Sequence, residues 1–200
     1  MIFARHAPTL ANEQFVMIGR TDTALHVDGH LCARRLANTL VGLPICAVIT
    51  SPLARARQTA DAIASLHTNC VRHMDERLME IDLGVVDGVS SFEAYELHKA
   101  AFDEALSPDT VDFAFPSGER WSSAAGRMEQ AVSDWSAEYS GQTLCIVTHG
   151  ALLGFWRCGL EQRSLGHFRA YQPKHASFSV AQKQGSNWQI LRWNDTSHLQ

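Results

Sequence analysis

The chain has 200 residues, 46% of them hydrophobic and 19% charged, which is enough to bury one sizeable core. We therefore expect a single compact domain covering residues 1–200. The formal net charge is −4 and no run of Lys or Arg occurs, which argues against a nucleic-acid partner. The start of the chain has no charged leader and no long apolar stretch, so we expect a cytoplasmic protein without a membrane partner.

Short apolar runs alternate with segments of helical periodicity through much of the sequence. Each apolar run ends at turn or polar residues, as buried strands do. In chain order the prediction is strand 2–4, helix 28–40, strand 45–49, a helix capped by Ser51-Pro52 and running to about Leu66, strand 143–148 and helix 151–156. This alternation predicts an α/β fold, a three-layer α/β/α sandwich with a mainly parallel sheet.

The remaining segments predict two additions to this core. Helices are expected at 92–106 and 118–139, separated by two prolines and an aromatic stretch, and the segment 85–120 reads as a helical insertion over a pocket. The tail alternates like a hairpin over 177–181 and 188–193, with its turn at 184–187. The hairpin would extend the sheet in the antiparallel direction.

Polar side chains follow the predicted strands at one edge of the sheet. Arg5 and His6 follow the first strand, and His149 follows the strand that ends at residue 148. Ligands of parallel α/β sheets bind beyond the carboxyl ends of the strands. Arg55 lies in the first turn of the helix after residue 50, and a guanidinium at a helix N-terminus favours an anion. We expect Arg57, two residues further on, to face solvent.

These residues belong to motifs that occur in a fixed order along nearly the whole chain. The motifs are Arg5-His6-Ala7-Pro8-Thr9, Gly19-Arg20-Thr21-Asp22, Ser51-Pro52-Leu53 with Arg55 and Gln58-Thr59-Ala60, Glu80, Pro116-Ser117-Gly118-Glu119 before Arg127, and Val147-Thr148-His149-Gly150. In this order they resemble the histidine phosphatase superfamily, also called phosphoglycerate-mutase-like. An Arg-His pair alone is weak evidence, whereas the ordered set is specific.

The resemblance implies a phosphatase that needs neither a cofactor nor a metal. His6 is then the nucleophile, which forms a transient phosphohistidine and divides hydrolysis into two displacements. Arg5, Arg55 and a protonated His149 would surround the negative oxygens of the phosphoryl group. Glu80 matches the family's carboxylic acid and would protonate the leaving group, then act as base for water.

Two further residues match family positions less specifically. Asn12 would donate an amide hydrogen bond to the phosphate, or it stabilises its own loop. Arg20 would reach the ester, or it faces solvent. The chain also departs from the family pattern at two positions. Ala7 stands where the family usually has Gly, and Val86 stands where the family commonly has Trp. Ala7 is tolerable if its backbone needs no positive φ, while Val86 would leave a smaller wall beside the pocket.

Three alternative functions stay open at this stage. A phosphoglycerate mutase would share the phosphohistidine, but Lys99 is the only Lys or Arg between residues 85 and 119, where mutases carry several basic residues. A non-catalytic phosphate-binding homologue need not keep all five site residues. A metal-dependent hydrolase would need paired ligands, and only His26 and His30 lie near each other, in a turn.

The expected partner is a small-molecule phosphate ester. Among phosphatases, the loop 19–22 and the compact insertion look most like the α-ribazole phosphate phosphatases. The sequence does not identify the ester or the oligomeric state, and a homodimer is left open.

Overall fold

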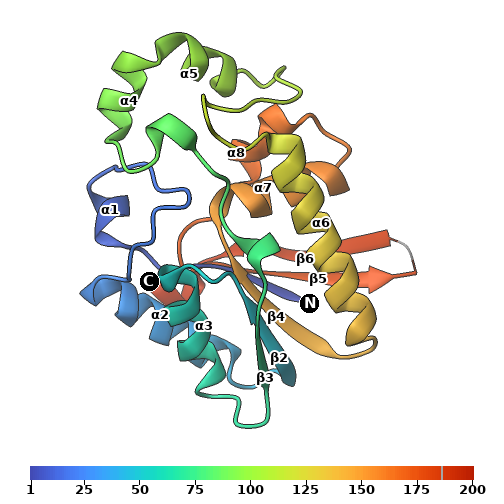
Figure 1. Ribbon diagram of the computed structural model, residues 1–200. Helices are drawn as coiled ribbons and strands as arrows, with labels where there is room; N and C mark the ends of the chain where they lie inside the picture. The colour runs from blue at the N-terminus through green and yellow to red at the C-terminus, as the bar shows by residue number, and fades with distance from the viewer. Residues whose placement is uncertain (186) are drawn as a thin grey trace.

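The protein is described by a computed structural model that covers residues 1–185 and 187–200. A mixed sheet forms its centre, with helices on both faces (Figure 1). The elements are β1 (Ile2–Arg5), α1 (Leu10–Glu13), α2 (Val27–Leu40), β2 (Ile45–Thr50), α3 (Ala54–Ala64), β3 (Val71–Met74), α4 (Ser91–Leu97), α5 (Lys99–Leu106), α6 (Trp121–Glu138), β4 (Thr143–Thr148), α7 (Gly150–Leu160), α8 (Phe168–Tyr171), β5 (Phe178–Gln184) and β6 (Asn187–Asp195), with 3-10 turns at Glu76–Leu78, Gly84–Val86, Leu165–His167 and Ser197–Leu199.

The sheet has the strand order β3-β2-β4-β1-β5-β6. β3, β2, β4 and β1 are parallel neighbours, whereas β5 pairs antiparallel with β1 and β6 antiparallel with β5. The predicted mainly parallel sheet with an antiparallel tail is confirmed. Ser186, in the predicted hairpin turn, lies outside the described residues.

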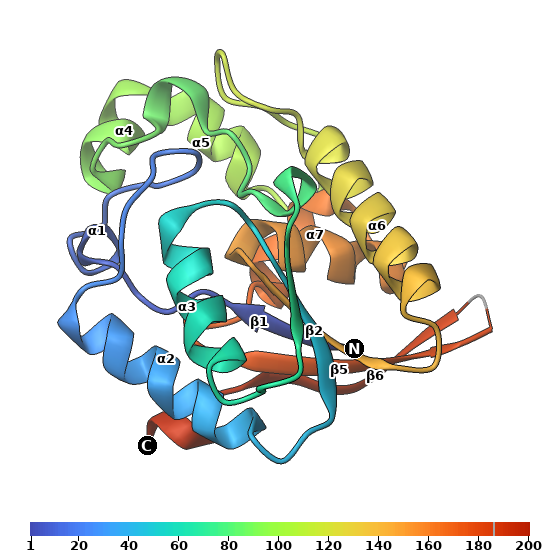
Figure 2. The same cartoon turned by 60° about the horizontal axis from the view of Figure 1, so that its bottom comes forward.

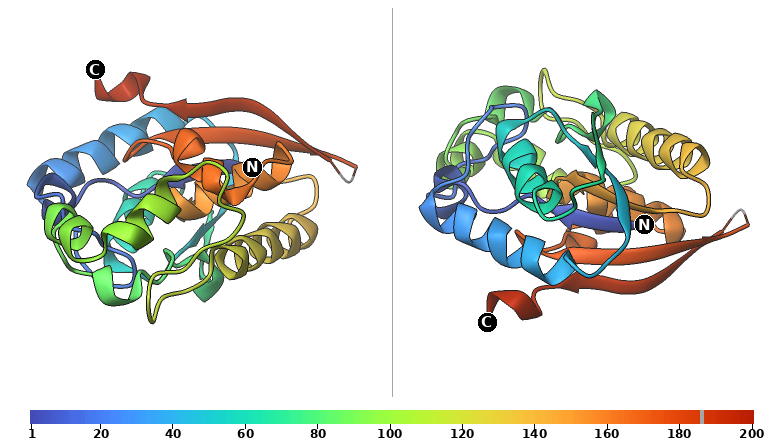
Figure 3. Two further views of the ribbon diagram at one scale, coloured as in Figure 1. Left: turned by 90° about the horizontal axis from the view of Figure 1, so that it is seen from above. Right: turned by 90° about the horizontal axis from the view of Figure 1, so that it is seen from below.

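Alternate residues of each central strand enter different helical layers, as the twofold period of a strand requires. Phe3 and Ile146 pack in the cluster that contains α6 and α7. Ile2, Ala4 and Val147 pack in the cluster with α2 and α3. Figures 2 and 3 show these two helix pairs on opposite faces of the sheet, which confirms the predicted three-layer sandwich.

The predicted elements do not include the short helices α1 and α8, and the structure differs from them at three further places. β3 was not predicted, because this edge strand is short and mostly exposed and lacks an apolar run. The helix expected at 92–106 is two helices that meet at His98, whose φ of −129° leaves the helical range. The expected cap at Ser51-Pro52 is wrong, because Leu53 is the N-cap of α3 and the Ser51 hydroxyl contacts His149 instead.

Figure 1 shows α4 and α5 at the top of the molecule, beyond the sheet, with α1 and α8 on either side below them. Arg169 of α8 donates a hydrogen bond to the carbonyl of Ala105 in α5 (2.6 Å), so the insertion is tied to α8. Within residues 1–185 and 187–200, no helix has the length and apolar character that crossing a membrane requires.

Two helical glycines provide a matched test of the packing of α2. A Cβ on Gly29 would lie 2.1 Å from the carbonyl oxygen of Pro8, whereas a Cβ on Gly126, in α6, has open space around it. We expect Gly29→Ala to lower the free energy of unfolding by about 1–3 kcal/mol through overpacking. Gly126→Ala should raise it by about 1 kcal/mol through helix propensity. Urea titration measures both, and equal stabilisation would contradict the close approach of α2 to Pro8.

Candidate active site

The pairing of β1 with β4 brings two histidines together. Arg5 stands opposite Thr148 in the parallel register, and the His6 amide donates to the Thr148 carbonyl (3.0 Å). The next residue of each strand is therefore a histidine at the same sheet edge. The ring centroids of His6 and His149 are 5.1 Å apart, and both side chains are buried.

The His6 ring has a defined protonation pattern. Its Nδ1 lies 2.8 Å from the carbonyl oxygen of Ala7, and because a carbonyl only accepts, Nδ1 carries the proton. Burial, followed by the charges of His149, His175, Arg55 and Arg5, holds the pKa of His6 well below its ordinary value. The ring is therefore neutral and its Nε2 keeps a lone pair, as a nucleophile requires.

Arg55 lies in the first turn of α3, as predicted, and is fully buried. Its two terminal nitrogens donate to the carbonyls of Thr21 (2.9 Å) and Gly19 (2.7 Å). The Asp87 carboxylate accepts hydrogen bonds from three backbone N–H groups of the same loop, those of Gly19, Arg20 and Thr21. Asp87 thus shapes the loop that holds Arg55, a role that the sequence did not indicate.

Three buried polar atoms at this sheet edge have no partner among the described residues. They are Nε of Arg5, Nε of Arg55 and Nδ1 of His149. Burial lowers the pKa of Arg5 to about 10, although the charge of Glu80 opposes the shift, so Arg5 stays positive at neutral pH. Buried polar groups are normally hydrogen-bonded, and two unpaired guanidinium donors beside a buried histidine at one sheet edge form a site for an anion.

Glu80 supplies a carboxylate beside the two arginines. It is buried, and its oxygens accept hydrogen bonds from the backbone N–H groups of Ile81 (3.0 Å) and Ala151 (3.2 Å). Its negative charge opposes the lowering of the pKa of Arg5 and Arg55 that burial causes. The sequence-predicted Arg5, Arg55 and Glu80 therefore interact electrostatically around one site.

Arg127 of α6 fixes the segment that carries Glu80. Its guanidinium donates to the carbonyls of Arg77 (2.6 Å) and Glu80 (3.2 Å) and forms two hydrogen bonds with Glu119. Burial alone would raise the pKa of Glu119, but the hydrogen bonds and charge of Arg127 lower it. The sequence motif included Arg127 without indicating this role.

A cavity of about 270 Å³ opens beside His6 and Glu80. Its polar lining consists of Arg5, His6, Asn12, Glu80, Arg169 and Gln172. Its apolar walls are Met17, Ile18, Ile81, Leu83, Phe115, Trp121, Ala151, Phe155 and Phe168. The predicted insertion contributes Phe115 to this wall, whereas α4 and α5 contribute no residue to it.

Asn12 and Arg20 occupy different positions relative to this cavity. Asn12 lines the cavity. Its side-chain amide oxygen accepts hydrogen bonds from the backbone N–H and the hydroxyl of Thr9, as part of a capping box at the start of α1. That arrangement leaves the amide N–H groups for an anion. Arg20 instead contacts Met79 and Glu119, outside the lining residues, so the structure does not bring it to the cavity. Phosphate binding by either residue stays a prediction.

The expected charge on His149 depends on the occupant of the site. Burial, and then the charges of Arg55 and Arg5, lower the pKa of His149 well below its ordinary value. Its Nε2 shares a hydrogen bond with the Ser51 hydroxyl (2.8 Å). The ring is neutral on its own, and a phosphate dianion beside it would favour the protonated form that we predicted.

The two departures from the family pattern have simple structural outcomes. Ala7 is buried and has no positive φ, so its side chain is tolerated. Val86 is fully buried in the core and is not among the residues that line the cavity; that Val in place of Trp leaves a smaller pocket wall stays a prediction.

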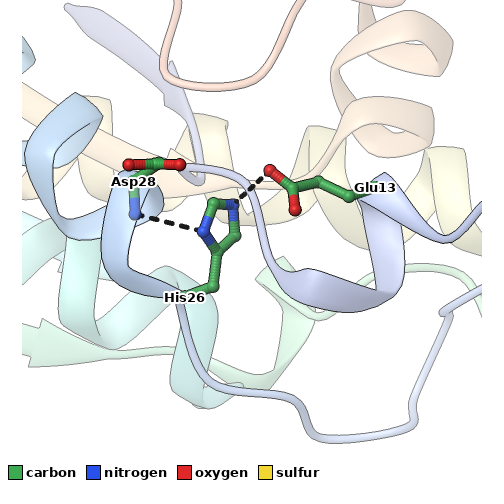
Figure 4. A group of neighbouring side chains, drawn as sticks. All are labelled: Glu13, His26 and Asp28. Carbon is green, nitrogen blue, oxygen red and sulfur yellow. Dashed lines mark hydrogen bonds and ion pairs between the residues drawn. The ribbon is translucent and has the colours of Figure 1, made fainter.

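One cluster has the composition of a metal site. The ligand atoms of Glu13, His26 and Asp28 lie within 4.8 Å of one another (Figure 4). However, the Nδ1 of His26 accepts the backbone N–H of Asp28 (3.1 Å), and its Nε2 lies 3.0 Å from the Glu13 carboxylate. Both ring nitrogens are thus engaged in capping α2 and joining it to α1. His30, the other histidine of this turn, is not part of the cluster.

Comparison with known sequences decides the family. Residues 1–196 match the family model of the histidine phosphatase superfamily (branch 1). The chain belongs to this superfamily. The chain is 29% identical over 201 residues to the Erwinia tasmaniensis protein named "Probable phosphoglycerate mutase GpmB", covering 98% of this chain and 93% of that protein.

Solved structures of similar proteins have the same fold. YhfR of Bacillus stearothermophilus superposes on this chain with a TM-score of 0.91 at 28% identity, over 100% of this chain and 98% of that one. An α-ribazole phosphatase of Shigella flexneri gives a TM-score of 0.84 at 20% identity, over 97% and 95% of the two chains. The second similarity, at this identity, establishes the fold alone.

The neutral buried histidines predict an acid-dependent loss of stability. Because the folded-state pKa of His6 is lowered, the unfolded chain binds more protons below about pH 6.5, and stability falls as the pH decreases from there. Replacing His6 by Gln should reduce this slope by about 1.4 kcal/mol per pH unit between pH 6 and 5. Denaturant titrations across this range measure the slope. An unchanged slope would show that His6 is protonated in the folded protein.

Proposed function

We propose that this histidine phosphatase hydrolyses a small phosphomonoester through a phosphohistidine at His6. One observation carries the proposal: the lone pair of the neutral His6 ring lies at a sheet edge where the buried Nε of Arg5, Nε of Arg55 and Nδ1 of His149 have no partner among the described residues. A phosphoryl group placed there meets a nucleophile and fixed positive charge together. Both are needed for a displacement at phosphorus.

The proposed reaction has two displacements. Glu80 takes up a proton when the phosphate binds beside it and enters the reaction as a carboxylic acid. Nε2 of His6 attacks phosphorus, the P–N bond forms, and the P–O bond to the alcohol breaks while the Glu80 carboxylic acid protonates the departing oxygen. A water molecule then attacks the phosphohistidine, and the Glu80 carboxylate takes its proton. The P–N bond breaks, inorganic phosphate leaves, and His6 and Glu80 return to their starting states.

The cavity walls support an ester with an apolar or aromatic alcohol part. Trp121, Phe155 and Phe168 pack against one another, with ring centroids 4.7–5.7 Å apart. Apart from the proposed catalytic groups, Arg169 is the only cation of the lining, and it already donates to the Ala105 carbonyl. α-Ribazole phosphate is one ester of this kind.

Phosphoglycerate mutase activity is a second candidate, favoured by the name of the curated relatives. A mutase must bind the carboxylate of its substrate, which calls for basic residues near the phosphate. Lys99, the only Lys or Arg between residues 85 and 119, instead pairs with Asp103 (2.6 Å) on an exposed surface of α5. This placement favours the phosphatase.

The central test compares wild-type protein with His6→Ala in excess chelator. We expect wild type to release phosphate from naphthyl phosphate and α-ribazole phosphate faster than from 3-phosphoglycerate, and His6→Ala to release none, because the nucleophile is missing. Free phosphate and any 2-phosphoglycerate are measured in parallel. Isomerisation of 3-phosphoglycerate without phosphate release would identify the mutase instead. Vanadate binding without turnover of any ester would identify a non-catalytic homologue.

The role of Glu80 is tested by varying the leaving group. Glu80→Gln should lower kcat/KM for an alkyl phosphate by about 10²–10⁴-fold, because an alkoxide needs a proton to leave. For p-nitrophenyl phosphate the loss should be below about tenfold, because nitrophenolate leaves without one. Steady-state kinetics on the two esters provide the comparison, and vanadate affinity controls for an intact pocket. Equal losses on both esters would contradict the acid role.

A further inference from the structure

A third histidine lies against the nucleophile, and the motifs did not include it. His175 belongs to the segment between α8 and β5, and its ring centroid is 5.1 Å from that of His6. The same distance separates His6 from His149. The Nε2 of His175 lies 2.7 Å from Nη2 of Arg5. His175 therefore touches two residues of the proposed phosphoryl site.

The backbone holds His175 in place from both sides. The Ala176 amide donates to the carbonyl of His6 (3.1 Å), and the Arg5 amide donates to the carbonyl of Ser177 (3.1 Å). Ala176 itself has a φ of 52°, a left-handed conformation that is unfavourable for alanine. Such a conformation persists where the surrounding contacts determine it, and it often accompanies a functional site.

The contact with Arg5 fixes the state of the His175 ring. A guanidinium has only donors, so Nε2 of His175 must accept, and the ring is neutral with its proton on Nδ1. Burial, followed by the charges of Arg5 and Arg55, lowers the pKa of His175 to about 3, which agrees with this neutral state.

The same short segment binds both terminal nitrogens of Arg5. Nη1 donates to the carbonyl of Pro173 (2.6 Å), and Nη2 donates to His175. The guanidinium also packs on the start of α7, since a Cβ on Gly150 would lie 2.8 Å from Cζ of Arg5. These contacts fix the plane of the guanidinium while Nε stays without a partner among the described residues.

We propose that His175 is a positioning residue of the phosphoryl site, which orients Arg5 through a neutral acceptor and leaves its positive charge available to the phosphate. The inference rests on the proposed function. A carboxylate at position 175 would also orient Arg5, but it would cancel much of the charge that attracts the anion. A neutral imidazole orients the guanidinium without this loss.

The chemistry of the acceptor provides a test with three variants. His175→Gln keeps a neutral acceptor at a similar reach, His175→Leu removes the acceptor, and His175→Glu keeps an acceptor but adds a negative charge. We expect His175→Gln to bind vanadate within about threefold of wild type. His175→Leu and His175→Glu should each bind it about ten- to a hundredfold more weakly, because a misplaced or neutralised Arg5 loses its contact with the anion.

Calorimetric titration with vanadate measures these affinities directly, and melting temperatures show whether each variant folds. If His175→Leu does not fold, the comparison of His175→Gln with His175→Glu still decides. Equal affinities of these two variants would overturn the proposal, because the charge at position 175 would then not affect anion binding. Wild-type affinity in His175→Leu would also overturn it, because the acceptor would then not be needed.

A double-mutant cycle then tests whether the effect passes through Arg5. In an Arg5→Lys background, His175→Leu should change vanadate affinity by less than about threefold, because the bidentate guanidinium is already gone. The same loss in both backgrounds would show that His175 acts independently of Arg5 and would overturn the proposal. If wild type binds vanadate but hydrolyses no ester, the proposed function fails while the measurements on His175 still stand.

Discussion

The parallel register of β1 on β4 is the constraint on which the candidate site depends. Arg5 stands opposite Thr148, so the residues that follow the two strands, His6 and His149, reach the same edge together. A shift of one residue would turn the side chains of β1 to the opposite faces of the sheet. Phe3 would then leave the α6–α7 layer, and His6 would lose its neighbour His149. Core packing and site geometry are therefore specified by the same pairing.

Buried charge is the second constraint, because an unpaired buried cation is costly. The protein meets this cost for Arg5 and Arg55 with neutral acceptors, which are backbone carbonyls and the His175 ring, and with the nearby carboxylate of Glu80. The neutral acceptors carry no net charge, so the two arginines and the single carboxylate together stay positive toward an anion. Asp87 holds the loop whose carbonyls bind Arg55, and Arg127 holds the segment that carries Glu80.

The sequence predicted the parts of this arrangement that follow from local pattern. Apolar runs and turn residues located β1, β2 and β4, and the strand-end position of His6 and His149 followed from topology. Partners brought together by tertiary packing were not visible. His175 contacts Arg5 from 170 residues away, and no periodicity marks it. β3 was missed for the same reason, since its pairing with β2 rather than its own composition makes it a strand.

The location of α4 and α5 has an evolutionary consequence. These helices sit beyond the sheet and support the cavity only indirectly, for example where Phe102 packs on Phe115 at a ring distance of 4.9 Å. Changes in this segment can accumulate, lengthen or be exchanged without disturbing the strand ends that carry the reactive groups. Drift in this peripheral module therefore acts on the cavity through contacts with its lining residues, such as Phe115, rather than at the strand ends themselves.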